Sequence, residues 1–222
     1  MHDGKVTSAA EENAQLPLAK RRTGDALATF YIQRAAEVAR ENHSSFLLEL
    51  AYGLDPRGSL SRYPLTASML GVIETEEEAA HRKKVLGAPT LQGRSDHLLH
   101  FVVSAALTEI VGPKVAEEQG IEKELADCRP DGSGFSFDDL LANLSGIRFT
   151  AWLMQDPRVR LKQLAETFDA RAFFPDPSAE PNGLSSEAFA NAFGSISDER
   201  FVTKIRALKA TVDAQRVLHR EW

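Results

Sequence analysis

The sequence predicts an all-α protein, with a single domain of about seven to nine helices over residues 23–222 and a flexible polar leader over residues 1–22. Apolar residues recur at spacings of three and four along most of the chain, and the strict alternation of a half-buried strand is scarce. Capping patterns and Pro or Gly breakers recur between these segments. Hydrophobic residues make up 43% of the chain, which is enough for a sizeable core.

Two helices are expected directly after the leader. Thr23 can cap a helix that runs to about Glu41. Ser44 can cap a second helix, which ends at the Asp-Pro-Arg-Gly breaker of residues 55–58. The residues of the first helix expected to face the core are Ala28, Phe30, Tyr31, Ala35 and Val38.

The next segment, residues 57–73, is expected to be irregular or to form a short helix. Thr75 and Glu78 then form a capping-box pattern, in which each side chain can bond to the other's backbone amide. This pattern predicts a helix over residues 75–86, and Gly87 follows its end.

Six further helices are expected in the second half of the chain, with loops at residues 87–94, 129–134 and 171–183. A second capping-box pattern, Ser136 with Asp139, opens the third of these helices. The first three should form a core at residues 95–155. The expected bounds are 95 or 96 to about 112, 114–128 with Pro113 in the first turn, 137–154, about 159–167, from about 185, and about 197–218.

Composition and charge exclude several classes of protein. The net charge of −6 and the pI near 5.6 argue against a nucleic-acid partner, which would require a basic surface. Cys128 is the only cysteine, so an intrachain disulfide and a Cys-rich zinc site are excluded. The most apolar stretch, residues 98–111, is too short and too polar for a transmembrane segment. Without a signal-peptide core, the expected compartment is the cytoplasm, or the periplasm or envelope if an export signal was removed.

Three consecutive helices of the predicted core carry polar pairs at helical spacing, so each pair shares one helix face. Ser104 extends the first pair by one turn, and Gly146 follows the third and is small enough to admit a neighbouring helix or a ligand. If the helices pack together, the pairs converge, with the loop 132–134 at one end. The pairs are Asp96 with His100, Glu124 with Asp127, and Asp139 with Asn143.

Burying such carboxylates costs several kcal/mol per charge unless a cation or hydrogen bonds compensate. One interpretation is a metal-assisted or carboxylate-dependent hydrolase that acts on a phosphoester or glycan of the cell envelope, with a divalent metal as its cofactor. The expected metal ligands are Asp96, His100, Glu124 and Asp127. The residues expected to activate water or to orient the ligands are Glu124, Asp127, Asp139 and Asn143.

The other interpretation, which is the simpler one, is a non-catalytic helical scaffold or interaction module. The polar pairs then fix the packing of the three helices, and the partner is another protein or an envelope component. Lys123 or Arg129 supplies positive charge, and His100 donates a hydrogen bond to a carboxylate. Truncation of Asp96 or Asp127 should then lower the melting temperature, because it strands a buried partner.

Residues 96–146 resemble a known family. The segments DHLLHFVVSA, GIEKELAD and GSGFSFDDLLANLSGI are similar to the pattern of small bacterial envelope lipoproteins of the YfiM type, and more distantly to VanZ-like membrane proteins. A fuller resemblance, which includes segments 63–66 and 87–90, suggests a larger soluble bacterial family of unknown function. The chain departs from the pattern by long additions on both sides and by lacking a lipobox and membrane spans. The resemblance implies a site but no reaction, and its residues are Asp96, His100, Lys123, Glu124, Asp127, Ser136, Asp139 and Asn143.

Other polar residues favour ordinary structural roles. The loop 132–134 follows a helix rather than a strand, so it is expected to turn the chain and not to form a nucleophile elbow. Cys128 is expected to be a quiet, partly buried thiol. His97 lies about 100° around the helix from Asp96, so it is expected to face solvent or a second partner.

Overall fold

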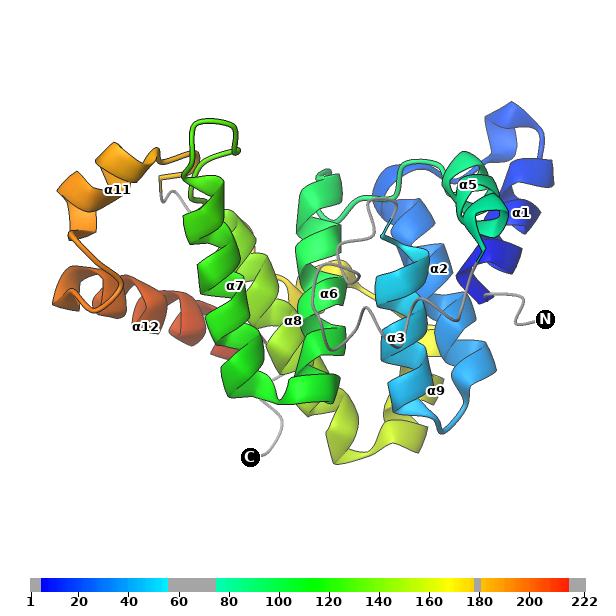
Figure 1. The fold of residues 1–222 in the computed structure, drawn as a ribbon. Helices are drawn as coiled ribbons and strands as arrows, with labels where there is room; N and C mark the ends of the chain where they lie inside the picture. Colours follow the sequence, from blue (N-terminus) through cyan, green and yellow to red (C-terminus); the bar gives the residue numbers. More distant parts are fainter. Residues whose placement is uncertain (1–4, 56–74, 178–180, 216–222) are drawn as a thin grey trace.

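The computed structural model describes residues 5–55, 75–177 and 181–215, and within these ranges it contains eleven α-helices, one 3-10 turn and no β-strand (Figure 1). The prediction of an all-α fold is therefore confirmed. The helices are α1 (Lys5–Gln15), α2 (Gly24–Ala39), α3 (His43–Gly53), α5 (Glu76–Val85), α6 (Ser95–Val111), α7 (Pro113–Asp127), α8 (Phe137–Gln155), α9 (Pro157–Glu166), α10 (Ala170–Phe173), α11 (Ser186–Phe193) and α12 (Glu199–Asp213), with the 3-10 turn η1 at Leu18–Lys20.

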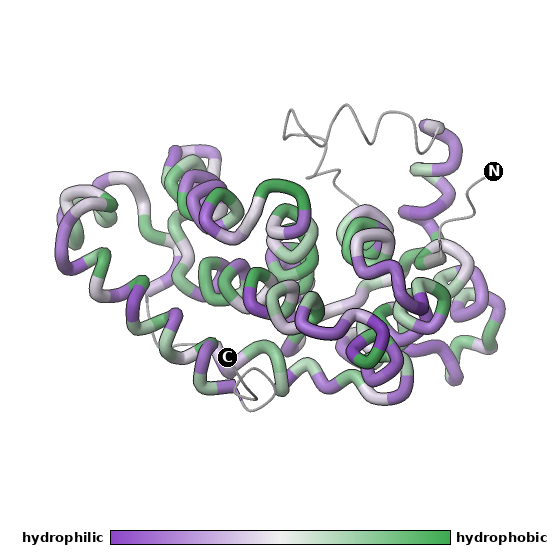
Figure 2. The backbone as a smooth tube through the Cα atoms, turned by 90° about the horizontal axis from the view of Figure 1, so that it is seen from below, coloured by the Kyte–Doolittle hydropathy of each residue, from purple (hydrophilic) through white to green (hydrophobic). Residues whose placement is uncertain are grey.

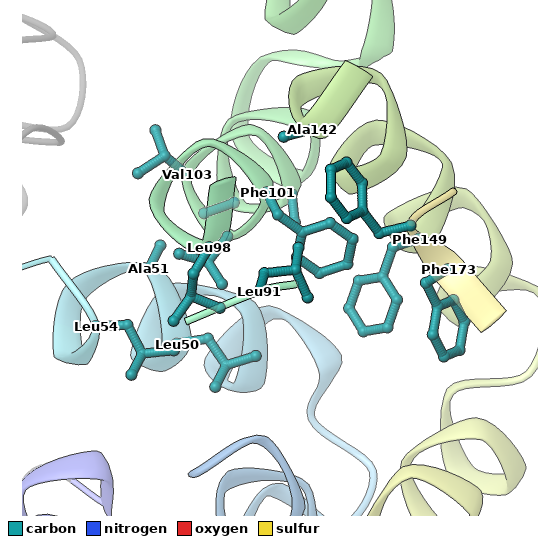
Figure 3. Packing of buried hydrophobic residues seen from close by; sticks show 14 of the residues in the cluster. Leu50, Ala51, Leu54, Leu91, Leu98, Phe101, Val103, Ala142, Phe149 and Phe173 are labelled. Atoms are coloured by element: carbon teal, nitrogen blue, oxygen red, sulfur yellow. The ribbon is translucent and has the colours of Figure 1, made fainter. Parts of the chain in front are cut away.

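Helix α6 lies at the centre of the molecule, between α3 on one side and α7 and α8 on the other (Figure 1). A Cβ atom on Gly146 of α8 would lie 2.1 Å from the carbonyl oxygen of Phe101, so only glycine permits this approach of α8 to α6. The expectation that Gly146 admits a neighbouring helix is confirmed. Leu98 and Phe101 of α6 pack between side chains of α3 and Phe149 of α8 (Figure 3).

A second group of buried side chains joins the start of α8 to the C-terminal helices. Five phenylalanines form this aromatic cluster, and Phe135 lies at its centre, with ring centroids 5.1, 4.8 and 5.8 Å from those of Phe137, Phe189 and Phe201. Phe193 packs against three of the other four rings. The cluster holds α11 and α12 against the start of α8, on the opposite side of α6 from α2 and α3 (Figure 1).

Hydrophilic and hydrophobic segments alternate along the helices in Figure 2, as expected for amphipathic helices that turn one face to the core. Across the parts of the chain that the structure describes, no helix combines the length and the apolar character needed to span a bilayer.

The helix count exceeds the prediction because two helices form where none was expected. Helix α1 occupies half of the predicted flexible leader, and α10 lies in the predicted loop 171–183 and begins just before it. Val6, Ala9 and Ala10 form a buried stripe, with exposed fractions of 0, 3 and 0%. This stripe is short and lies among polar residues. The mostly polar composition of residues 1–22 therefore predicted a flexible leader and not a helix. A Cβ on Gly53 would lie 2.5 Å from Cβ of Val6, so glycine admits α1 onto α3.

Four details of the helices differ from the prediction. Thr23 lies at the N-cap of α2, but its side chain makes no capping hydrogen bond. The side chain that caps α3 is Asn42, which accepts a hydrogen bond from the amide of Ser45, and Ser44 instead donates to Glu109. Val38, expected to face the core, is 48% exposed. The last helix ends at Asp213 and not near residue 218. The capping box at Thr75 is confirmed, and the prediction for residues 57–73 lies outside the described residues.

Candidate functional site

Helices α6, α7 and α8 bring the predicted polar pairs together. The N-terminal half of α6 and the first turns of α8 meet the C-terminal turns of α7 at this point (Figure 1). Ser136 caps α8 by accepting a hydrogen bond from the amide of Asp139 at 3.1 Å. Only half of the predicted capping box forms there, because the Asp139 carboxylate faces α6. We call the residues at the centre of this convergence the polar cluster: His100, Lys123, Glu124, Asp139 and Asn143.

His100 is held in one tautomer. Its Nδ1 lies 3.0 Å from Oδ1 of Asn143, and the same oxygen lies 2.8 Å from the hydroxyl of Ser104. An amide oxygen can only accept, so we assign the proton to Nδ1, and the lone pair of Nε2 faces the cluster. Burial, with the Lys123 ammonium, lowers the pKa of His100 to about 4, so the ring is neutral at pH 7.

Glu124 is fully buried. Its Oε1 accepts from Nζ of Lys123 at 2.9 Å, and its Oε2 accepts from the amide of Ser136 at 3.1 Å. Burial raises the pKa of Glu124 to about 7, while Lys123 acts in the opposite direction. Burial also raises the pKa of Asp139, again opposed by Lys123. Both carboxyl groups are therefore protonated at a higher pH than exposed carboxyl groups are.

Lys123 places an ammonium group among these acceptors. Its Nζ lies 2.6 Å from Oδ2 of Asp127 and 3.2 Å from Nε2 of His100, in addition to its contact with Glu124. Burial lowers the pKa of this ammonium, but Glu124 and Asp127 more than compensate and the net shift is upward. The side chain remains 37% exposed, so the polar cluster surrounds a cation that can reach solvent.

Three donor atoms of the polar cluster lie close enough to hold one metal ion. They belong to His100, Glu124 and Asp139, and all lie within 4.8 Å of one another. Nε2 of His100 is 3.8 Å from Oε1 of Glu124 and 3.5 Å from Oδ2 of Asp139. We call these three residues the triad.

Two of the four expected metal ligands, Asp96 and Asp127, do not belong to the triad. The guanidinium of Arg94 holds Asp96 through contacts of 3.0 and 2.6 Å, and this hydrogen-bonded pair lowers the pKa of Asp96 to about 2. Asp127 is occupied by Lys123 and accepts from the hydroxyl of Ser133 at 3.1 Å. Helical spacing places Asp96 and His100 on the same face of α6. It does not predict that Arg94 pairs with Asp96. Asp139, which was expected only to orient the ligands, is instead the third member of the triad.

His97 differs from its prediction, because its side chain is 0% exposed. Its ring packs edge-on against Phe174, with centroids 5.2 Å apart, and its Nε2 lies 4.0 Å from Oδ1 of Asp139. Neither ring nitrogen has a hydrogen-bond partner among the described residues. Burial, with Arg94 nearby, lowers its pKa. The covering residue lies in the segment that was expected to be a loop, so α6 alone gave no signal of this burial.

A cleft of about 310 Å³ opens beside the polar cluster, between α6 and α7. His100, Lys123 and Asn143 belong both to its lining and to the polar cluster. The apolar part of the lining comes from α6. The lining residues are Leu99, His100, Val103, Ser104, Leu107, Gln119, Gly120, Glu122, Lys123 and Asn143.

Comparisons of this chain with protein-family models, with curated proteins and with solved structures found no match. The likeness of residues 96–146 to YfiM-type lipoproteins stays a prediction.

Proposed function

We propose that the triad binds a divalent transition metal and that this chain is a metal-assisted hydrolase. The observation that carries the proposal is the position of Nε2 of His100, whose lone pair faces Glu124 and Asp139 at 3.8 and 3.5 Å. Metal–ligand bonds of about 2.1 Å place neighbouring ligand atoms roughly 3 to 3.5 Å apart. A small closure of the two carboxylates therefore gives a metal site.

The surroundings of His100 support the same proposal. A metal-binding histidine usually donates its other N–H to a protein acceptor, which fixes the tautomer. Asn143 provides this acceptor, at 3.0 Å. One imidazole and two carboxylates suit Zn²⁺ or Mn²⁺ better than Ca²⁺, which prefers oxygen donors alone. The Lys123 ammonium must give up its contacts with Glu124 and His100 when the metal binds, and its partly exposed side chain can do so while keeping Asp127 as a partner.

A bound metal would polarise the scissile bond and make its water a stronger nucleophile. In the hydrolysis of a phosphoester, a water oxygen would form a bond to phosphorus, the ester P–O bond would break, and the departing alcohol oxygen would take up the proton that the water had passed to Asp127. Asp127 is the remaining carboxylate beside Lys123 and can accept the proton that the water loses. Asn143 and Ser104 keep the His100 ring oriented throughout.

The test compares Lys123→Met with Lys114→Met on the same helix. Lys114 is 88% exposed and lies 3.9 Å from Glu118, outside the cluster. In chelator, Lys123→Met should lower the melting temperature, because it leaves buried carboxylates without their cation. Added Zn²⁺ or Mn²⁺ should restore it, and this variant should bind the metal more tightly than the natural protein does. Lys114→Met should behave like the natural protein. The proposal would be overturned if neither Zn²⁺ nor Mn²⁺ bound to the natural protein or to Lys123→Met.

A structural scaffold is the second candidate function, and one observation favours it. The Lys123 ammonium already contacts Glu124 and Asp127 at 2.9 and 2.6 Å, so the cluster has a cation without any metal. A scaffold predicts that Lys123→Met lowers the melting temperature and that no divalent metal restores it. The same thermal experiment therefore separates the two functions.

A further inference from the structure

The cleft carries an aliphatic stripe that metal-assisted hydrolysis does not require. Leu99, Val103 and Leu107 are spaced four residues apart on α6 and line one side of the cleft. The stripe begins next to His100 and extends away from it for roughly 12 Å, at 1.5 Å per residue. The cleft therefore has a polar end at the metal site and an apolar body.

The polar end contains one hydrogen-bond donor that the protein does not use. Asn143 is 4% exposed, and its Nδ2 has no hydrogen-bond partner among the described residues. Gly120, another lining residue, lies against it, since a Cβ there would come within 2.8 Å of Nδ2. A buried amide without an acceptor costs about 1–3 kcal/mol. An acceptor oxygen on a ligand would remove this cost.

We infer that the substrate is a single-chain alkyl phosphoester, which the protein takes from solution. This inference rests on the hydrolase proposed above. The hydrocarbon chain of the substrate lies along Leu99, Val103 and Leu107, and its phosphate lies at the polar end, beside Lys123 and Asn143. Ammonium and amide N–H groups are suitable donors to phosphate oxygens. Hydrolysis releases the alkyl alcohol and inorganic phosphate.

Two features of the cleft select this substrate class. A glycan would place hydroxyl groups against three aliphatic side chains, where they lose their hydrogen bonds to water. The volume of about 310 Å³ is at the small end of ligand pockets, and favours one chain over the two chains of a membrane phospholipid.

The test measures the affinity of the natural protein for hexyl, octyl and decyl phosphate by calorimetry, below their micelle concentrations, with and without Mn²⁺. Inorganic phosphate serves as the probe of the head group alone. We expect affinity to rise by about fourfold for each added methylene group, the gain for burying one methylene. Equal affinity across the series would overturn the inference.

Two variants test where the hydrocarbon chain of the ligand binds. Val103→Trp fills the cleft and should weaken decyl phosphate binding at least tenfold without affecting inorganic phosphate, whereas Val38→Trp, on the exposed surface of α2, should change neither. Leu99→Ser, at a half-buried position, provides a second variant if Val103→Trp does not fold, and it too should weaken decyl phosphate. Unchanged affinity in Leu99→Ser would place the chain elsewhere and contradict the inference.

Failure of the inference can be told apart from failure of the hydrolase. Glu124→Gln removes a triad ligand but no lining residue, so hydrolysis should stop while the dependence on chain length persists. Metal binding without dependence on chain length would overturn this inference alone. Dependence on chain length without metal binding would overturn the hydrolase and leave the cleft as a binding site for alkyl phosphates, not for a substrate. Co-sedimentation with dihexadecyl phosphate vesicles, without binding of monomeric decyl phosphate, would assign the site to a lipid surface and overturn the solution substrate.

Discussion

Two buried clusters of opposite chemistry meet at the first turn of α8. Phe137 belongs to the aromatic cluster, and Asp139, two residues further along, belongs to the polar cluster. The aromatic cluster contains no titratable group, and its stability comes from apolar area. The polar cluster contains charges whose burial costs free energy unless each keeps its partner. The aromatic cluster therefore adds stability through apolar area alone, whereas the polar cluster is the part of this region that the proposed metal site would use.

The largest expected effect is on the aromatic side of this comparison. Phe135 is 0% exposed and contacts three other rings, so Phe135→Ala should lower the free energy of unfolding by about 3–5 kcal/mol. No charge is involved, so the loss should be the same at pH 5.5 and pH 8. Urea denaturation at the two pH values measures it. A loss that depends strongly on pH would show that the two clusters are energetically coupled.

Two groups of the polar cluster have pKa values that shift in opposite directions, so their effects on stability should oppose each other as the pH changes. The pKa of Glu124 is raised from 4.5 to about 7 on folding, so between these pH values the folded chain binds a proton that the unfolded chain does not. The contribution of Glu124 to the free energy of unfolding therefore falls as the pH rises from 4.5 to about 7. The pKa of His100 is lowered from 6.5 to about 4, so its contribution rises between pH 4 and 6.5. In the natural protein, the two contributions largely cancel from pH 4.5 to 6.5.

Two substitutions should separate these contributions in chelator-containing buffer. Glu124→Gln leaves the His100 contribution, so stability should rise with pH from 4.5 to 6.5 by up to about 1.4 kcal/mol per pH unit. His100→Gln leaves the Glu124 contribution, so stability should fall over the same range. Urea denaturation at pH 4.5, 5.5 and 6.5 gives both slopes. Slopes of the same sign in the two variants would contradict the assigned protonation states.

The smallest expected effect concerns the edge of the polar cluster. Asp96 is 41% exposed and pairs with Arg94, so solvent screens this ion pair and Asp96→Asn should cost at most about 1 kcal/mol. Metal affinity should remain unchanged, because Asp96 lies outside the triad. Asp139→Asn is the matched variant inside the triad, and should weaken metal binding strongly. Equilibrium dialysis with Zn²⁺ compares the two, and equal losses would restore Asp96 to the ligand set.

Local signals predicted most of the helices and much of the polar cluster. The capping side chains of Thr75 and Ser136 fix helix starts through contacts within three residues, so the sequence alone was sufficient there. Spacing of four residues placed His100 and Asn143 correctly on their faces. Prediction failed where distant segments decide the outcome, as in the cover of His97 by Phe174 and the docking of α1 onto Gly53. The cleft also depends on how α6 and α7 pack, which no local pattern contains.

The proposed metal site can be tested without any substrate, by measuring through mass spectrometry the metal content of untagged protein purified without chelators. His100→Ala serves as the control, because it removes the only nitrogen donor of the triad. We expect close to one Zn or Mn per chain in the natural protein and a marked loss in His100→Ala. An absence of bound metal in the natural protein, and no uptake when Zn²⁺ or Mn²⁺ is added, would contradict the account and leave Lys123 as the cation of a structural network.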